Sequence, residues 1–477
     1  MIHKPAAAEV VSVLAVMVCS ALLLTFRLGN PILWIDEVFT TNYIRHGYDF
    51  LLDFARPDER HPPGHYLTLK AWSQLFGADR VGVRSMSVAW AVLCLPLLYG
   101  IVRMRFDRRM ALIAIAYLAV FPGFVYYGRE ARMYAQLFGL LMLASFLFLV
   151  LFNRFQTLGT GKRILLTLCF AVVLAGTFYT HYISFIFYAC FSIAGVALAV
   201  LRKDVPWLLY AFSGIALATL LAVPQIFHML KFVTPATDEW IPYSDLGVFY
   251  ATLLGTYDAP TLAKPLLYIV YLLGFAYLWR SDKEFTVFLG VFLVLGPILL
   301  GLIGAVRPVL LVRTLQPFSL FAPILIAVVA THVPWKRVGV GLALYVAVVN
   351  AVTFSAYFPA QRQNLFAEEA QAVITSFSPQ QDEIFYIEHL QPQFELMRID
   401  YGDFRPIGFK SVAEGEAVIL AHLERCQREQ DCGKTVVIME SDPLIEKQAG
   451  TRWNDFARSL GPSEVIGIEG YFIYVVE

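Results

Sequence analysis

The stretch VGVRSMSVAWAVLCLPLLYGIVRMRFDRR, residues 81–109, joins a long apolar run to a short basic turn. Residues 81–102 are long enough to form a helix that crosses about 30 Å of hydrocarbon. The turn RMRFDRR, residues 103–109, is rich in arginine, which is typical of short loops on the cytoplasmic face of a membrane. The stretch therefore predicts a transmembrane helix that ends on the cytoplasmic side.

Similar apolar runs recur along most of the chain. The protein has 477 residues, of which 58% are hydrophobic and 16% are charged, whereas soluble domains are about 25% charged. We predict eleven spans, at about 8–26, 81–102, 110–127, 134–152, 164–180, 183–201, 207–228, 264–279, 285–305, 315–331 and 338–358. The formal net charge is zero, so the sequence offers no basic face for nucleic acid.

The distribution of Lys and Arg predicts the orientation. An N-terminus on the inside makes five short turns cytoplasmic, and each of them carries at least two basic residues; they are 103–109, 153–163, 201–204, 279–284 and 332–337. The C-terminus is then outside. We expect the first span to be an uncleaved anchor, because no small-residue cleavage site follows it.

The composition after residue 358 becomes that of a soluble domain. Strand-like runs at 383–388, 435–440 and 464–477 alternate with helix-like runs at 413–429 and 443–461, a pattern that predicts a small α/β layer. Its role stays open between substrate gating, partner docking and simple stabilisation. In an outside compartment Cys426 and Cys432 would form a disulfide, and the alternative is two unpaired thiols.

The expected fold class is therefore an α-helical polytopic membrane protein with a small α/β C-terminal domain. We predict a transmembrane domain at 1–358, which includes the outer loop 27–80, and an extracytoplasmic domain at 359–477.

Asp36 and Glu37 follow the first span directly, in the motif LWIDEVF. Adjacent helical residues point about 100° apart, so only one of the two can face a given reacting atom. Apolar neighbours raise a carboxylate pKa and a nearby arginine lowers it, which together suit a general base. The alternative is a solvated pair that caps the next helix.

The motif RHPPGHY, residues 60–66, gathers Arg60, His61 and His65 around a rigid corner. The two prolines fix the backbone there, and they remove the helical i, i+4 geometry that a pair of metal-binding histidines would need. An anionic group such as phosphate suits this corner better than a metal ion, which we keep as the minority alternative.

Further polar residues fall at outer turns that the orientation places on the same side. They are Arg129, Glu130, Arg132 and Tyr134 in GREARMYA (128–135), His181 and Tyr182 in THYISF (180–185), and Arg307 and Arg313 in RPVLLVRTLQPF (307–318). Ionisable residues near membrane depth are costly and so indicate function. The alternative for each arginine is snorkelling to lipid headgroups.

In their order and spacing these motifs resemble the C-type membrane glycosyltransferases. The acidic pair, HPP, the span at 83–106 and GREARMYA are most similar to the family 39 and protein-mannosyltransferase-like group, which includes the rhizobial galacturonosyltransferases. The resemblance covers about residues 1–360 and is strongest over 30–140. Relatives commonly have a bulky residue where this chain has Gly64, which puts the shape of the acceptor site in question.

The resemblance implies roles for individual residues. Asp36 corresponds to the acidic residue that deprotonates the acceptor hydroxyl, with Glu37 beside it. The residues expected near the donor phosphate are His61, Arg129, Arg132 and Arg313. Those expected to bind other parts of the substrates are Arg60, His65, Glu130, Tyr134, His181 and Tyr182.

The function expected from these features is transfer of a sugar from a polyprenyl-phosphate donor to an extracytoplasmic glycan, lipid or protein. The transfer would be a base-assisted, inverting displacement in a bacterial inner membrane, with membrane lipids as surroundings and with no metal or other cofactor. Two alternatives come from other classes: a transporter or flippase of lipid-linked sugars, and a non-catalytic assembly factor of the envelope. Hydropathy shows no strong internal repeat, which favours the enzyme over the transporter.

Overall fold

The computed structural model describes residues 7–30, 33, 35–53, 61–231, 241, 243–256, 264–332, 337, 340, 341, 344, 345, 348, 383–387, 407–409, 412–429, 435–440, 456, 458–462, 464–468 and 471–476. Arg60, Cys432 and most of the predicted span 338–358 lie outside the described residues.

The chain packs as two compact units. The membrane unit comprises Met1–Leu28 and Tyr43–Pro359, and the second unit comprises Gly29–Asn42 and Ala360–Glu477. The boundary predicted at residue 358 stays a prediction, because the second unit also includes part of the first outer loop.

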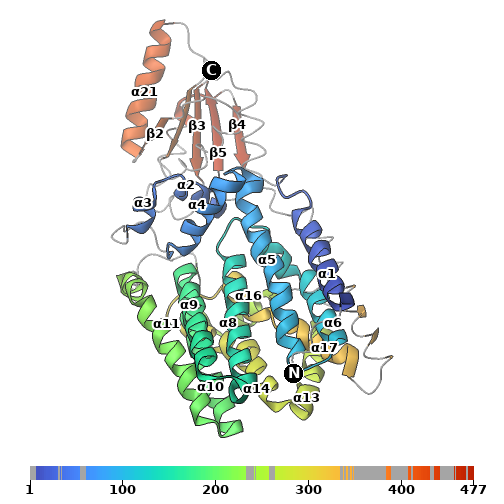
Figure 1. Cartoon of the computed structure of the whole chain (residues 1–477). Helices are drawn as coiled ribbons and strands as arrows, with labels where there is room; N and C mark the ends of the chain where they lie inside the picture. The colour runs from blue at the N-terminus through green and yellow to red at the C-terminus, as the bar shows by residue number, and fades with distance from the viewer. Residues whose placement is uncertain are drawn as a thin grey trace. The chain divides into compact units, whose positions relative to one another are not determined.

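The membrane unit is a bundle of helices (Figure 1). Its helices are α1 (Ala7–Thr25), α3 (Tyr48–Leu52), α4 (Gly64–Phe76), α5 (Arg80–Arg103), α6 (Arg108–Ala119), α7 (Pro122–Tyr127), α8 (Tyr134–Arg154), η1 (Phe155–Thr157), α9 (Thr160–Thr180), η2 (Tyr182–Ser184), α10 (Phe185–Arg202), α11 (Val205–Lys231), α12 (Leu246–Thr256), α13 (Lys264–Ser281), α14 (Lys283–Gly290), η3 (Val291–Leu295), α15 (Gly296–Gly304), α16 (Val312–Ser319) and α17 (Ala322–His332).

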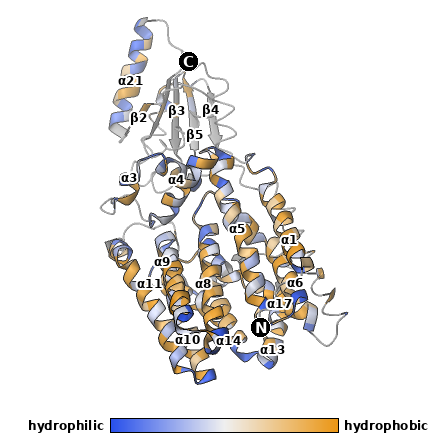
Figure 2. Cartoon of the chain, viewed as in Figure 1, coloured by the Kyte–Doolittle hydropathy of each residue, from blue (hydrophilic) through white to orange (hydrophobic). Residues whose placement is uncertain are grey.

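Among the described residues, eight helical segments are long and apolar enough to cross a membrane, and Leu266–Ser281 is a shorter apolar helix. Their middle turns are hydrophobic and their ends are polar (Figure 2). The expected class of fold, a helical multi-pass membrane protein, is confirmed. The predicted span 110–127 is divided between α6 and α7, because Pro122 has no N–H to continue the hydrogen-bond ladder of α6.

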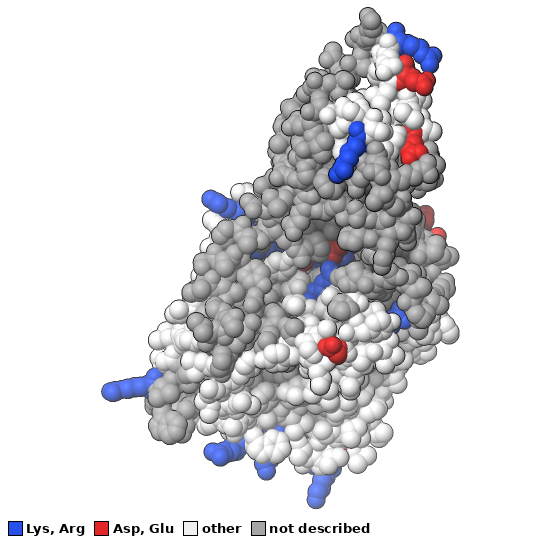
Figure 3. All heavy atoms as spheres, turned by 180° about the vertical axis from the view of Figure 1, so that it is seen from behind, with Lys and Arg blue, Asp and Glu red and all other residues white. Residues whose placement is uncertain are grey.

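Several of the turns that connect the spans lie at one end of the bundle. At the end that we call the basic end, the α5–α6 turn lies beside the start of α1, and Arg103 Nε is 2.9 Å from Glu9 Oε1. Lys and Arg side chains protrude from this end of the membrane unit in Figure 3.

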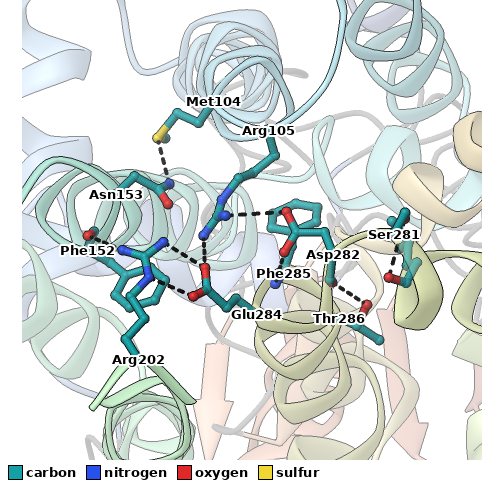
Figure 4. Close-up of polar contacts among 11 residues, drawn as sticks. Met104, Arg105, Phe152, Asn153, Arg202, Ser281, Asp282, Glu284, Phe285 and Thr286 are labelled. Atoms are coloured by element: carbon teal, nitrogen blue, oxygen red, sulfur yellow. Dashed lines mark hydrogen bonds and ion pairs between the residues drawn. The ribbon is translucent and has the colours of Figure 1, made fainter. Parts of the chain in front are cut away.

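A cluster of ionic contacts ties several turns together at the basic end (Figure 4). Glu284 accepts hydrogen bonds from Arg105 Nη2 at 2.8 Å and from Arg202 Nε and Nη2 at 2.6 Å each. Arg105 Nη1 is also 3.4 Å from Asp282 Oδ2. Arg202 donates to the carbonyl of Phe152 at 2.9 Å, and its guanidinium lies 3.6 Å from the centroid of that ring. The cluster therefore joins the α5–α6 and α13–α14 turns to the ends of α8 and α10.

The second unit contains a five-stranded sheet in the order β2-β1-β3-β5-β4. The elements are α2 (Ile35–Tyr43, all but its last residue in this unit), β1 (Glu383–Ile387), β2 (Ile407–Phe409), α21 (Val412–Glu429), β3 (Thr435–Glu440), β4 (Glu464–Ile468) and β5 (Tyr471–Val476). β1 pairs in parallel with β2 and β3, whereas β5 pairs antiparallel with β3 and β4. The predicted α/β layer is confirmed in the described residues, where the run at 464–477 contains two strands instead of one. Most of the predicted helix 443–461 lies outside the described residues.

The core of this unit is small. Phe385, Ile419, Val437 and Tyr474 are buried together, which packs α21 against the sheet. Cys426 at the end of α21 is disulfide-bonded, while its predicted partner Cys432 lies outside the described residues.

Candidate active site

Four segments of the membrane unit meet at the end of the bundle opposite to the basic end. They bring together His61, Arg132, Tyr134, His181 and Arg313, which we call the histidine cluster. The ring centroids of His61 and His181 are 5.9 Å apart, and those of Tyr134 and His181 are 6.0 Å apart. Arg132 and Arg313 are close enough to His181 to act on its charge.

His181 is held in one protonation state. It caps η2, because its Nδ1 accepts a hydrogen bond from the backbone N–H of Ile183 at 3.2 Å. A neutral imidazole with Nδ1 as acceptor carries its proton on Nε2. Burial, followed by the positive charges of His61, Arg132 and Arg313, holds the pKa of His181 well below its usual value of 6.5. His181 is therefore a neutral hydrogen-bond donor at physiological pH.

The double proline and Gly64 place His61 beside His181. Helix α4 begins at Gly64, directly after Pro62 and Pro63. A Cβ atom on Gly64 would lie 2.5 Å from the carbonyl oxygen of Tyr179, at the end of α9. Only glycine permits so close a contact at this position, so Gly64 has a packing role in this chain.

We expect Gly64→Ala to destabilise the membrane unit by about 1–3 kcal/mol, because the added methyl group overpacks a backbone contact. The displaced corner should also lower activity, since His61 precedes it. Thermal unfolding of the purified protein measures the first effect. Gly47→Ala is the matched control, because a Cβ on Gly47 meets nothing within 4 Å. Equal stability of the two variants would contradict the proposed packing.

His65 lies in the protein interior and is 0% exposed. Its Nδ1 is 3.1 Å from Gln136 Oε1, which also accepts a hydrogen bond from Thr68 Oγ1 at 2.9 Å. Burial lowers the pKa of His65 to about 3, so its ring is neutral in the folded protein. His65 joins α4 to α8, and its predicted role in substrate binding stays a prediction.

Arg129 and Arg84 stabilise the end of α1. Arg129 donates to the carbonyl oxygens of Phe26 at 2.7 Å and Leu23 at 3.4 Å, and Arg84 donates to that of Leu28 at 2.9 Å. Carbonyls at a helix C-terminus lack partners within the helix, and cationic side chains satisfy them. Burial and the neighbouring Arg84 lower the pKa of Arg129 to about 10. Arg129 thus has a structural task in addition to its predicted phosphate contact.

The other residues of the turn 128–133 differ in their surroundings. Glu130 is 7% exposed, and its backbone carbonyl accepts a hydrogen bond from the hydroxyl of Ser87. Arg132 is 5% exposed and acts electrostatically on both His181 and His65. Arg132 is therefore the arginine of this turn that joins the histidine cluster.

Tyr182 contacts a different part of the structure than its neighbour His181 does. Its hydroxyl lies 3.3 Å from Gln225 Oε1 and contacts His228 Nδ1, both on α11. Gln225 and His228 were not predicted from the sequence, and neither were Gln136 and Arg84. The signal was present in VPQIFHML, residues 223–230, where two polar residues interrupt the end of an apolar span.

Asp36 and Glu37 occupy the first turn of α2 in the second unit. The side chain of Glu37 is 0% exposed, while that of Asp36 is partly exposed. Asp36 is therefore the more accessible of the two carboxylates. Their predicted catalytic roles stay predictions.

Among the residues that the structure describes, no group of three or more His, Cys, Asp and Glu side chains could hold a metal ion. The histidine cluster instead combines two guanidinium groups with a neutral N–H donor. Such a set suits a phosphate group, because arginine can donate two parallel hydrogen bonds to its oxygens.

Comparisons with known proteins bear on the family and on the fold. Residues 60–228 match the family described as Dolichyl-phosphate-mannose-protein mannosyltransferase. The matched segment contains every residue of the histidine cluster except Arg313. A search of curated protein sequences finds no match.

Solved structures with a similar fold cover nearly the whole chain. ArnT from Cupriavidus metallidurans in the apo state has a TM-score of 0.61 at 12% identity, with 98% of each chain covered. The same protein bound to undecaprenyl phosphate has a TM-score of 0.59 at 13% identity, again with 98% of each chain covered. The archaeal oligosaccharyltransferase AglB from Archaeoglobus fulgidus, in complex with an inhibitory peptide and a dolichol-phosphate, has a TM-score of 0.52 at 12% identity, with 98% of this chain and 74% of that chain covered.

The chain therefore has the fold of the C-type membrane glycosyltransferases. The resemblance to the protein-mannosyltransferase-like group, first apparent from the order of the motifs, is confirmed by the family match and by the fold.

Proposed function

We propose that this protein is an integral membrane glycosyltransferase that moves a sugar from a polyprenyl-phosphate donor to an extracytoplasmic glycan, lipid or protein. The observation that carries the proposal is the histidine cluster, in which Arg132 and Arg313 lie about the neutral N–H donor His181. The similar fold of a protein solved with undecaprenyl phosphate bound supports a lipid phosphate as the ligand.

The proposed reaction is a single displacement. An acceptor hydroxyl attacks the anomeric carbon of the donor, the bond from that carbon to the phosphate oxygen breaks, and the lipid phosphate leaves. Asp36 removes the proton of the attacking hydroxyl. The leaving phosphate gains one negative charge, which Arg132, Arg313 and the Nε2–H of His181 stabilise. One displacement inverts the configuration of the sugar.

The same charge argument bears on cofactors. Nucleotide-sugar enzymes often use a divalent metal to neutralise a diphosphate. A lipid monophosphate carries less charge, and the two arginines of the histidine cluster offset it. We therefore propose that the transfer needs no metal or other cofactor.

We propose a bacterial inner membrane as the location, with the basic end in the cytoplasm and the second unit outside. The short turns rich in Lys and Arg support this orientation. The disulfide of Cys426 supports an oxidising surrounding for the second unit.

Arg313 is the residue whose substitution tests the phosphate contact. We expect Arg313→Ala to lower catalytic efficiency about ten- to a hundredfold, because a charge-assisted hydrogen bond is worth about 1.5–3 kcal/mol. Arg313→Lys should recover only part of the loss, since lysine lacks the planar fork. Activity against donor concentration, normalised to folded enzyme, measures the effect. Snorkelling to lipid predicts instead that Lys replaces Arg freely and that Ala lowers only expression.

The function itself is tested in cells. Mass spectrometry of envelope glycans and lipids should show one sugar that is missing without this protein and restored by the wild-type chain. The chain with Asp36→Asn should not restore it. Restoration by a chain that carries both Asp36→Asn and Glu37→Gln would favour a transporter or an assembly factor over an enzyme.

A further inference from the structure

Three polar side chains lie where η2 meets the end of α11, and the reaction proposed above uses none of them. They are Tyr182, Gln225 and His228, and we call them the tyrosine triad. The Tyr182 hydroxyl is 3.3 Å from Gln225 Oε1 and contacts His228 Nδ1. Gln225 is 0% exposed and His228 is 5% exposed. The triad is thus a buried polar site at the end of an otherwise apolar helix.

Gln225 has an unused hydrogen-bonding group. Its amide Nε2 has no hydrogen-bond partner, although buried polar groups are almost always paired. Rotating the side-chain amide of Gln225 by about 180° would still leave one of its polar atoms without a hydrogen bond. The nitrogen would then face Tyr182, and the oxygen would be left unpaired instead. A hydrogen-bonding position is therefore open in the triad, and near membrane depth such a position indicates a ligand.

The triad and the histidine cluster are neighbours through the backbone. Tyr182 directly follows His181, and the Cα atoms of consecutive residues are about 3.8 Å apart. The ring of His181 lies against His61 and Tyr134, whereas Tyr182 contacts α11. A phosphate held at His181 would thus carry its attached sugar within reach of Tyr182.

We propose that the tyrosine triad binds hydroxyl groups of the donor sugar. The proposal rests on the proposed function. A phenol, an amide and an imidazole can each pair with a hydroxyl group. A site built to hydrogen-bond a hydroxyl also rejects analogues that lack it, so the triad selects the sugar while the histidine cluster holds the phosphate.

The test compares two probes, undecaprenyl phosphate and undecaprenyl-phosphate-linked glucose, by their binding to the purified full chain. Wild-type protein should bind the glucose lipid more tightly than the bare lipid phosphate. Gln225→Met, which keeps the volume but removes the amide, should lose about three- to tenfold of this sugar-dependent gain. Its affinity for undecaprenyl phosphate should stay within about twofold of the wild type. Tyr182→Phe should behave in the same way.

Tyr188→Phe is the matched control. The Tyr188 hydroxyl lies 3.2 Å from the carbonyl oxygen of Leu174 and 3.4 Å from that of Ala218, so it joins α9 and α11 away from the triad. Its loss should lower thermal stability without changing the sugar-dependent gain.

The outcomes separate this inference from the proposed function. If Gln225→Met and Tyr182→Phe keep the full gain and lose only stability, as the control does, the triad is a structural link and the inference is wrong. Wild-type protein that binds neither lipid would overturn the proposed function and the inference with it.

Discussion

Purified Asp36→Asn should lose about 10²–10⁴-fold in turnover, which is the usual contribution of a general base. The amide keeps the size and shape of the side chain but cannot accept the proton of the acceptor hydroxyl. Asp36 lies in the first turn of α2 and is partly exposed, so its carboxylate is accessible. Donor binding should be nearly unchanged, because the proposed phosphate contacts come from the histidine cluster.

Glu37→Gln is the control for this experiment. Glu37 is 0% exposed, so we expect its substitution to lower stability more than turnover. An inactive Glu37→Gln beside a fully active Asp36→Asn would move the base to Glu37. Full activity in both variants would show that neither carboxylate is the base.

The second large effect is on stability. We expect Glu284→Ala to lower the free energy of unfolding by about 3 kcal/mol, because removing one partner leaves the charges of the others without compensation. Glu284 accepts three hydrogen bonds from Arg105 and Arg202, and its side chain is 22% exposed. Thermal unfolding in detergent, followed by a probe of the membrane unit, measures the change.

The neighbouring residue supplies the comparison for Glu284. Lys283 is exposed, and its ammonium lies 5.9 Å from the centroid of the Trp279 ring. Lys283→Ala should change stability by less than about 0.5 kcal/mol. If Glu284→Ala is as stable as Lys283→Ala, the ionic cluster at the basic end does not stabilise the packing of the α5–α6 and α13–α14 turns.

Much of the fold follows from local properties of the chain. Apolar length predicted the helices, and alternation with helical spacing predicted the α/β layer. The break at Pro122 was not predicted, although proline cannot donate a backbone hydrogen bond to the preceding turn. The pairing of strands within 464–477 depends on a reversal between β4 and β5, and the prediction of a single strand overlooked the dipeptide Glu469–Gly470 between the two apolar runs.

The site was harder to predict, because residues of the same type in one motif have different roles in the folded protein. Arg129 and Arg132 stand three residues apart in one motif, yet Arg129 stabilises the end of α1 and Arg132 acts on His181. The sequence offers no rule that separates them, since the end of α1 is far away along the chain. Likewise, His65 shares its motif with His61 but is buried against Gln136.

The central claim is that this chain transfers a sugar from a lipid phosphate. Its most direct test follows a radiolabelled sugar on undecaprenyl phosphate, mixed with the purified protein and with membranes from cells that lack it. The account predicts that the label leaves the lipid and becomes bound to an envelope acceptor, that EDTA does not stop this, and that Asp36→Asn abolishes it. A label that stays on the lipid, or that only crosses the bilayer on it, would contradict the account.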